Sequence, residues 1–259
     1  MMKTGFLPVR LLMLFSRAAM MMLNCFFGRG QCCACGTFTA RGVLCRSCTE
    51  EKLYGAAREA ARSPRCDVCG KVLLGEEKTC MSCRTGRILL STYKSVPVLP
   101  YRIWLKTLLF EWKMNGQRSL SPVFARLCDI AIRSHFSGSF AIVPVPPRPG
   151  KIKRLGWDQI DELSEILRRT YRYRVLKLLE RTTGIQQKKL SRTGRLESKG
   201  RGYAVSRLCL RLSAEGALPS HVILIDDVLT TGVTAESCAR LLKDAGVSKV
   251  AVLTLFIVD

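Results

Sequence analysis

Acidic residues are few in this sequence. Among its 259 residues, 20 are Asp or Glu and 42 are Lys or Arg, so the formal net charge is +22. This balance favours anionic partners such as nucleic acid, acidic membrane or phosphorylated ligands, but it does not indicate a fold. Because 47% of the residues are hydrophobic and 24% are charged, the composition excludes an intrinsically disordered chain. The length suits one large domain or two smaller ones.

The sequence also lacks a long uninterrupted hydrophobic run. Residues 6–27 are rich in Met, Leu and Phe, but Arg10 and Arg17 interrupt them before the ~20 apolar residues of a membrane span are reached. No A-x-A-like cleavage site precedes the cysteines. We therefore expect a cytoplasmic protein with no stable membrane span. A helix that packs on the protein or lies on a surface would present one apolar stripe, formed by Leu7, Leu11, Leu14 and Met21.

A second interpretation of residues 1–28 is that translation starts later in the sequence. Three methionines stand together at Met20, Met21 and Met22. A start at Met20 would leave the first 19 residues outside the native protein. We therefore treat 1–28 as an N-terminal apolar segment, separate from the domains.

Cysteine is the residue that this sequence has in excess. Eight of the 13 cysteines form four C-x2-C pairs, arranged as two similar units. Gly36 and Gly70 follow the first pair of each unit, and nine or ten residues separate the pairs within a unit. Two thiolates three positions apart on a tight turn can bind one tetrahedral ion, and the glycine lets the backbone fold beneath the sulfurs. The repeat predicts a double zinc ribbon with two structural Zn²⁺ sites, made by Cys32, Cys35, Cys45 and Cys48, and by Cys66, Cys69, Cys80 and Cys83.

Two questions about the cysteines stay open at the level of the sequence. A disulfide framework of a secreted domain is the alternative to metal, although the duplicated C-x2-C spacing favours metal. Either Cys32 or Cys33 could be the first ligand, and the x2 spacing favours Cys32. Outside the ribbons, we expect Cys128 and Cys238 to be small core residues on helices.

The rest of the chain predicts an α/β domain. Cysteine pairs stop and apolar alternation begins near residues 88–100, so we place the double zinc ribbon at 29–90 and the second domain at 91–259. Residues 183–211 are basic and weakly periodic, and we expect loops there. Hydrophobic spacing predicts helices at 101–114, 122–134, 158–171 (with Asp158 as N-cap) and 234–245, and strands at 139–145, 175–179, 222–225 and 250–257. The last segment forms a βαβ unit, which predicts a parallel sheet.

The segment 222–234 carries the most chemistry. Four apolar residues precede Asp226 and Asp227, which would lie at the carboxyl end of a strand, where open α/β sheets bind ligands. We expect a polar loop from Asp226 to Gly232, in which the two carboxylates accept hydrogen bonds from a vicinal diol. The hydroxyls of Thr230, Thr231 and Thr234, together with the free N–H groups of the following helix, would bind a dianion. A ribose 5-phosphate has both groups; the alternative is an ordinary βα turn with an aspartate cap.

This string resembles the PRPP-binding motif of the type I phosphoribosyltransferases: four apolar residues, two acids, two further residues and then Thr-Thr-Gly-x-Thr. In that family the acid pair binds the ribose hydroxyls, and the threonine-glycine turn binds the 5-phosphate of Mg²⁺–PRPP. The resemblance implies an α/β fold of that type, with helices on both faces of a parallel sheet. It also implies a PRPP site, with Mg²⁺ as the accompanying metal, formed by Asp226, Asp227, Val228, Thr230, Thr231, Gly232, Val233 and Thr234.

A double cysteine ribbon ahead of such a domain is similar to the ComF family, whose members include the late-competence protein of DNA uptake. Residues 143–146 (Val-Pro-Val-Pro) match that family's Pro-Val-Pro, and residues 113–116 (Lys-Met-Asn-Gly) resemble its Lys-Tyr-x-Gly. Residues 154–159 (Arg-Leu-Gly-Trp-Asp-Gln) depart from its Arg-Gly-Phe-Asn-Gln by an extra Leu155 or a shifted arginine, by Trp for Phe and by Asp for Asn. A weaker Gln…Leu…Arg match falls on Gln186/Gln187, Leu190 and Arg195.

The resemblance covers nearly all of residues 30–257 and implies binding of PRPP or a related phosphoribosyl ligand in DNA uptake, with other DNA-uptake proteins as partners. If the protein is an active phosphoribosyltransferase, a pentosyl glycosyltransferase, the loop after Pro146 could contact pyrophosphate. The candidates for that contact are Arg148, Lys151, Lys153, Arg154 and Gln159. The sequence identifies no catalytic residue and no recognition element for an acceptor, so binding of PRPP is better supported than its transfer.

The stretch 148–211 suggests a second class of function, binding of single-stranded DNA. It contains 18 Lys and Arg and six Asp and Glu, a net charge of +12. Cations follow a phosphate backbone and aromatic rings stack on single-stranded bases. The rings available in this stretch are Trp157, Tyr171, Tyr173 and Tyr203. The alternative is a basic face that is simply solvated.

Overall fold

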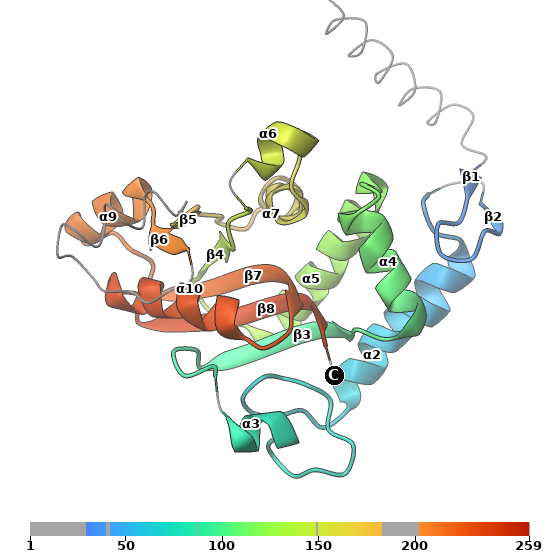
Figure 1. Cartoon of the computed structure of the whole chain (residues 1–259), viewed down its shortest axis with the longest axis horizontal. Helices are drawn as coiled ribbons and strands as arrows, with labels where there is room; N and C mark the ends of the chain where they lie inside the picture. Colours follow the sequence, from blue (N-terminus) through green and yellow to red (C-terminus); the bar gives the residue numbers. More distant parts are fainter. Residues whose placement is uncertain (1–29, 40–41, 87, 149, 183–201, 259) are drawn as a thin grey trace, which may run out of the picture. The chain divides into compact units, whose positions relative to one another are not determined.

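The computed structural model describes residues 30–39, 42–86, 88–148, 150–182 and 202–258, apart from the side chains of Ile103, Lys153 and Arg154. Two compact units divide between Lys52 and Leu53 (Figure 1). The second pair of cysteine knuckles therefore belongs to the same unit as the central sheet. The ribbon boundary at residue 90 remains a sequence-based prediction, and the apolar segment 1–28 lies outside the described residues.

The first unit contains a small hairpin. Strand β1 (Gly30–Gln31) pairs antiparallel with β2 (Phe38–Thr39), and a helical turn, η1 (Cys48–Leu53), follows the second knuckle. The loop between the strands holds the first C-x2-C pair, so the hairpin brings that pair to a tight turn.

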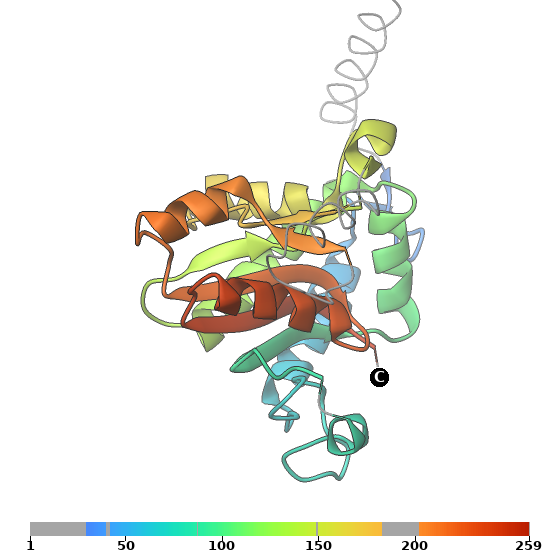
Figure 2. The same ribbon diagram turned by 60° about the vertical axis from the view of Figure 1, so that its left-hand side comes forward.

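A four-stranded parallel sheet forms the centre of the second unit. Its strands are β3 (Lys94–Pro100), β4 (Ala141–Pro144), β7 (His221–Leu229) and β8 (Lys249–Ile257), in the order β3-β8-β7-β4. Helix α10 (Val233–Asp244) connects β7 to β8 and completes the predicted βαβ unit. The predicted fold class, a parallel sheet with helices on both faces, is confirmed: α10 covers one face and α5 and α7 cover the other (Figures 1 and 2).

The helices largely follow the predicted spacing. Asp158 caps α7 as expected, because its Oδ1 accepts hydrogen bonds from the backbone N–H groups of Ile160 and Asp161. No helix within the described ranges has the length and apolar character needed to cross a membrane. The remaining helices are α2 (Tyr54–Arg62), α3 (Met81–Thr85), α4 (Ile103–Lys113), the 3₁₀ turn η2 (Arg118–Leu120), α5 (Ser121–His135), α6 (Lys151–Leu155), α7 (Gln159–Arg169) and α9 (Arg207–Ala214).

Two sequence-based expectations differ from the structure. The strand expected at 175–179 is reduced to one bridge between Val175 and Ile142, and the chain then enters β5 (Leu179–Arg181), which pairs antiparallel with β6 (Tyr203–Val205). The segment 183–211 is not all loop, because residues 207–214 form α9. Its N-cap Ser206 accepts a hydrogen bond from the N–H of Cys209, which is fully buried. Leu208 and Leu212 pack against the same buried cluster as Cys209, so α9 buries one face. With eight residues it is too short for hydrophobic spacing to identify it reliably.

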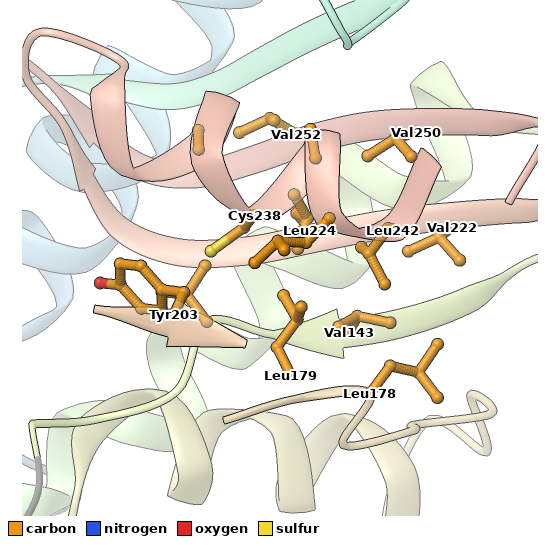
Figure 3. Close-up of a cluster of buried hydrophobic side chains, with 14 of the residues drawn as sticks. Val143, Leu178, Leu179, Tyr203, Val222, Leu224, Cys238, Leu242, Val250 and Val252 are labelled. Carbon is orange, nitrogen blue, oxygen red and sulfur yellow. The ribbon is translucent and has the colours of Figure 1, made fainter. Parts of the chain in front are cut away.

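The core between the sheet and α10 fixes the ends of both elements. Val222 and Leu224 of β7 belong to the same buried cluster as Cys238 and Leu242 of α10, and the β5–β6 hairpin adds Tyr203 (Figure 3). Each fully buried aliphatic side chain contributes about 1.5–3 kcal/mol. Both Cys128 and Cys238 are fully buried on helices, as expected. Leu229, the last residue of β7, and Ala235, in the first turn of α10, belong to the same cluster, so the packed core holds both of these ends in place.

Several features of edge strand β3 prevent another strand from pairing with it. It contains Pro97 and Pro100, which lack the N–H of a sheet ladder. The guanidinium of Arg65 donates to the carbonyl oxygen of Pro97 at 2.7 Å. The Oγ of Ser95 donates to the carbonyl of Cys69 at 3.0 Å. A Cβ on Gly70 would lie 2.5 Å from the Ser95 carbonyl oxygen, so the knuckle formed by Cys66 and Cys69 packs directly against this edge.

Candidate functional site

The acid pair lies within a strand, which corrects the predicted polar loop from Asp226 onward. Strand β7 runs to Leu229, and Asp226 and Val228 are in register with Thr254 and Phe256 of β8. Side chains alternate between the two faces of a strand, so the carboxylates of Asp226 and Asp227 point to opposite faces of the sheet. The prediction was wrong because two carboxylates in succession resemble the start of a loop. In the structure, the pairing of β7 with β8 continues past both residues to Leu229.

The side chain of Asp227 forms polar contacts with residues of two helices. Its side chain is buried, and its Oδ2 lies 2.5 Å from the Nζ of Lys113, at the end of α4. The same oxygen accepts a hydrogen bond of 2.7 Å from the Nε2 of Gln159, the first residue of α7. A buried carboxylate is tolerated when it is paired and hydrogen-bonded in this way. Asp227 therefore ties α4 and α7 to the carboxyl end of β7.

A second cation extends this network. The Nζ of Lys151 lies 2.6 Å from the Oδ2 of Asp158 and also contacts the side-chain oxygen of Gln159. Lys151, which the sequence suggested as a pyrophosphate contact, is thus already paired within the fold. Three segments that are distant in sequence, 113–116, 151–159 and 226–227, meet at one place. Only the family resemblance pointed to Lys113 and Gln159, because neither lies in a motif that spacing alone identifies.

The turn at residues 113–116 packs against the segment before α7. Gly116 has a φ of +67°, and a Cβ there would lie 3.7 Å from the indole nitrogen of Trp157. The guanidinium of Arg118 lies over the Trp157 ring, 5.8 Å from its centroid. The glycine is thus needed for the left-handed turn and leaves room for the indole.

Asp226 faces the side of the sheet covered by α10. It is partly buried, and its Oδ1 accepts a hydrogen bond of 2.8 Å from the backbone N–H of Asp227. Burial and, to a smaller extent, the adjacent charge of Asp227 raise the pKa of Asp226 to about 8. Thr254, its neighbour in register on β8, has a buried hydroxyl with no hydrogen-bond partner among the described residues. Asp226 therefore makes no ion pair among the described residues, and its surroundings favour the protonated form at neutral pH.

The predicted phosphate loop follows β7 directly. Thr230 and Thr231 are exposed, and Gly232 has a φ of +80° at the N-cap position of α10. The N-cap residue is a glycine and offers no capping side chain, so the first N–H groups, beginning at Val233 and Thr234, can accept an anion as partner. The carboxylate of Glu236 accepts from the backbone N–H groups of Leu90 and Ser91 at 2.9 Å, which holds the chain before β3 beside the loop.

The other residues suggested as ligand contacts are less well defined. Arg148 is exposed in the loop that follows β4, at the same end of the sheet as the phosphate loop. The side chain of Arg154 lies outside the described residues, and so does the whole weak match at Gln186/Gln187, Leu190 and Arg195.

Several aromatic and basic residues of the stretch 148–211 already have partners. Tyr203 is 6% exposed in the core, and the hydroxyl of Tyr173 donates to the Oδ1 of Asp129 at 2.7 Å. Arg168 and Arg169 both pair with Glu165. Within the described part of this stretch, the exposed arginines include Arg148, Arg172, Arg174, Arg207 and Arg211. The structure therefore uses these rings for packing and leaves basic groups at the surface.

The eight paired cysteines form two clusters in the expected sets: Cys32, Cys35, Cys45 and Cys48, and Cys66, Cys69, Cys80 and Cys83. Within each cluster the ligand atoms all lie within 4.8 Å of one another, and the Sγ atoms of Cys35 and Cys45 are 3.7 Å apart. Sulfurs at about 2.3 Å from a tetrahedral ion would be ~3.8 Å apart, whereas a disulfide joins them at ~2.05 Å. The clusters therefore fit structural zinc and lack the spacing of disulfides.

The two clusters also repeat one backbone turn. Gly36 donates from its N–H to the Cys32 carbonyl at 2.8 Å, and Gly70 to the Cys66 carbonyl at 2.9 Å. Both glycines have φ near +73°, which explains their place after each knuckle. Cys33 lies outside the cluster and donates from its N–H to the Val43 carbonyl. Cys32 is therefore the residue that completes the first set.

No protein-family model matches the chain, but three curated bacterial proteins are similar to it. Competence protein F of Haemophilus influenzae is 27% identical over 238 residues, which cover 89% of this chain and 97% of that protein. Competence protein ComFC of Bacillus subtilis is 27% identical over 200 residues, 70% of this chain and 72% of that protein. Competence protein ComFC of Streptococcus pneumoniae is 25% identical over 158 residues, 61% of this chain and 66%, just under two thirds, of that protein.

Proposed function

Because this chain is a homologue of the ComF-family competence proteins, we propose that it acts in DNA uptake, in the cytoplasm, by binding PRPP or a related ribose 5-phosphate ligand at the carboxyl end of β7. The observation that carries the proposal is the uncapped first turn of α10, placed directly after a carboxylate pair on a rigid strand. A phosphate would bind the N–H groups of that turn and the hydroxyls of Thr230, Thr231 and Thr234.

The two carboxylates would have different parts in this binding. Asp226 is partly exposed and makes no ion pair among the described residues, so its oxygens are freer than those of Asp227 to accept hydrogen bonds from ribose hydroxyls. Asp227 would join it only by sharing its oxygens with Lys113 and Gln159. Mg²⁺, which accompanies PRPP, would add positive charge near this acid pair. These contacts account for binding and leave the existence of a transfer reaction open.

A working phosphoribosyltransferase is the more specific form of the proposal. In that reaction a nucleophile forms a bond to C1 of the ribose, the bond from C1 to pyrophosphate breaks, and the nucleophile's proton is released. Arg148, exposed in the loop after β4 at the same end of the sheet, is the candidate to contact pyrophosphate. Release of pyrophosphate from PRPP in the presence of an acceptor would distinguish the enzyme from a binding protein.

Gly232→Ala tests the phosphate loop. We expect it to weaken PRPP binding at least tenfold, because alanine is strained at a φ of +80° and its Cβ would lie 3.3 Å from the Cδ2 of Leu89. Isothermal titration with Mg²⁺–PRPP measures the effect. Gly216→Ala is the matched control: it has a φ of +63° and open space around the Cβ, and it lies before the opposite end of β7. Equal loss of affinity in both variants would exclude a phosphate site at the loop.

Binding of single-stranded DNA is a second candidate function. It is supported by the exposed arginines of α9 and by the competence proteins to which the chain is similar. Stacking of bases on Tyr173 and Tyr203 has no support, since both rings pack within the protein. Any binding would therefore depend on contacts to phosphate.

Binding through phosphate contacts predicts that the affinity for single-stranded DNA depends steeply on salt concentration. If three or more phosphates are contacted, the affinity for an oligothymidylate should fall roughly tenfold or more between about 50 and 200 mM salt. Arg207→Glu and Arg211→Glu on α9 should each weaken binding, whereas Arg62→Glu on α2 is a charge-matched control outside the basic stretch. Fluorescence anisotropy measures both effects. Binding that is insensitive to salt, or equally weakened by Arg62→Glu, would contradict a basic DNA-binding surface on α9.

A further inference from the structure

One acidic side chain of α10 holds a distant segment of the chain beside the phosphate loop. Glu236, in the first turn of the helix, accepts three hydrogen bonds from residues 90–91. Its Oε2 accepts from the backbone N–H groups of Leu90 and Ser91, both at 2.9 Å, and its Oε1 accepts from the Oγ of Ser91 at 2.6 Å. These donors lie 145 and 146 residues away along the chain. Both oxygens of this carboxylate therefore serve to fix the position of one neighbouring segment.

The segment 88–91 packs on the turn where a phosphate would bind. Leu89 is 3% exposed and belongs to the same buried cluster as Leu229 before the loop and Ala235 after it. A Cβ built on Gly232 would lie 3.3 Å from the Cδ2 of Leu89. A glycine without such a cover would sample many backbone conformations. The packing of Leu89 therefore holds the left-handed turn at Gly232 in one conformation.

The hydrogen bonds to Glu236 are not part of the central sheet. Pairing of this part of the chain with β8 begins two residues later, where the N–H of Tyr93 donates to the carbonyl oxygen of Val250 at 3.0 Å. Leu90 is 69% exposed, so water can hydrogen-bond its backbone N–H if the carboxylate is removed. Loss of Glu236 should therefore free the segment 88–91 and leave the sheet folded.

We propose that Glu236 is a positioning residue for the phosphate loop: it fastens the segment 88–91, keeps Leu89 on Gly232 and so holds the first N–H groups of α10 ready for a phosphate. The inference rests on the proposed function and deepens it, because it names the contact that orders the site before the ligand binds. An ordered loop loses less conformational entropy on binding than a loose one, so the contact raises the affinity without touching the ligand.

Two substitutions of Glu236 separate its position from its charge. Glu236→Ala removes all three acceptor contacts, and we expect it to weaken the binding of Mg²⁺–PRPP and of ribose 5-phosphate about tenfold or more. Glu236→Gln can keep the contacts, because its Oε1 can accept from both backbone N–H groups and its Nε2 can donate to the Oγ of Ser91. We expect its affinities to stay within about threefold of the wild type. Isothermal titration measures both variants, and an equal loss of affinity in the two would overturn the inference.

Hydrogen exchange of the backbone N–H groups of residues 230–236, measured by mass spectrometry, is a second readout that needs no ligand. Glu236→Ala should speed this exchange about tenfold or more, whereas Glu236→Gln should leave it unchanged. Leu89→Ala, which shortens the side chain that covers the turn, should act like Glu236→Ala. Leu242→Ala is the matched control, because it truncates a buried leucine of the same cluster in the last turn of α10 (Figure 3). It should change neither the exchange of the loop nor the affinity for Mg²⁺–PRPP.

The possible outcomes distinguish this inference from the proposed function. If the wild type binds Mg²⁺–PRPP and Glu236→Ala binds it equally well, the positioning role is wrong and the phosphate site remains. If Leu242→Ala weakens binding as much as Glu236→Ala, the effect is a general loss of stability, which also overturns the inference. If the wild type binds neither PRPP nor ribose 5-phosphate, the proposed function is refuted and the exchange rates decide alone. Faster exchange in Glu236→Ala would then support the ordering of the loop by Glu236, and unchanged exchange would overturn it.

Discussion

Cys66→Ser is expected to remove one of two bound zinc ions and to destabilise the second unit by about 3 kcal/mol or more. Cys66 is 3% exposed and forms a small buried cluster with Leu73 and Cys80, so loss of the ion would leave three thiols without a partner at the base of the knuckle. Zinc content by mass spectrometry and unfolding in denaturant measure the two effects.

Two cysteine variants serve as controls for this result. Cys33→Ser should keep both zinc ions, since Cys33 lies outside the first cluster. Cys45→Ser should lose one ion, yet leave the unfolding midpoint of the second unit unchanged, because Cys45 belongs to the other compact unit. Two zinc ions retained in Cys66→Ser would show that the clustered sulfurs are not zinc ligands.

Asp226→Asn and Asp227→Asn should both weaken PRPP binding tenfold or more, but they should have opposite effects on stability. Asp227→Asn removes the ion pair with Lys113 and weakens the contact with Gln159, so we expect a loss of about 1–3 kcal/mol. Asp226→Asn removes a partly buried acid whose ionised form is disfavoured by burial and by the adjacent charge of Asp227, so the protein should be as stable as the wild type or more stable.

The dependence of stability on pH distinguishes the two carboxylates. Asp226 has a pKa of about 8 in the folded protein and a much lower one when unfolded. Between these values the folded chain holds a proton that the unfolded chain has lost, so stability falls as the pH rises from about 4 to 8 and is constant above that for this group. Asp226→Asn should abolish this slope. Denaturant unfolding at several pH values measures it; an unchanged slope would show that Asp226 is not the titrating group.

The sequence allowed three strands of the sheet, α10 and the two cysteine sets to be predicted because each depends on residues close together in the chain. Edge strand β3 (Lys94–Pro100) was not among the predicted strands. A buried strand shows as four apolar residues at 222–225, and a knuckle shows as C-x2-C followed by glycine. The network around Asp227 depends instead on Lys113 and Gln159, which lie 114 and 68 residues away from it along the chain. No local pattern encodes such contacts, and here only the family resemblance indicated those two segments.

A local pattern can also group residues that the fold separates, as the end of β7 shows. Asp226 and Asp227 are adjacent in sequence and were interpreted as one diol-binding pair, but the strand register separates them onto two faces of the sheet. A one-residue slip of β7 would exchange them and would also turn Val222 and Leu224 out of the core. The hydrophobic half of the motif thereby determines which carboxylate would meet the proposed ligand.

The packing of the Cys66–Cys69 knuckle on β3 has a consequence for solubility. An exposed edge strand is a template for pairing between molecules, and β3 is protected by its prolines, by Arg65 and by the backbone around Gly70. If this cluster holds zinc, loss of the metal should release the knuckle and expose the β3 edge. In cells short of zinc, the protein would then be lost to aggregation while most of its core was still folded, so its abundance would follow the metal supply.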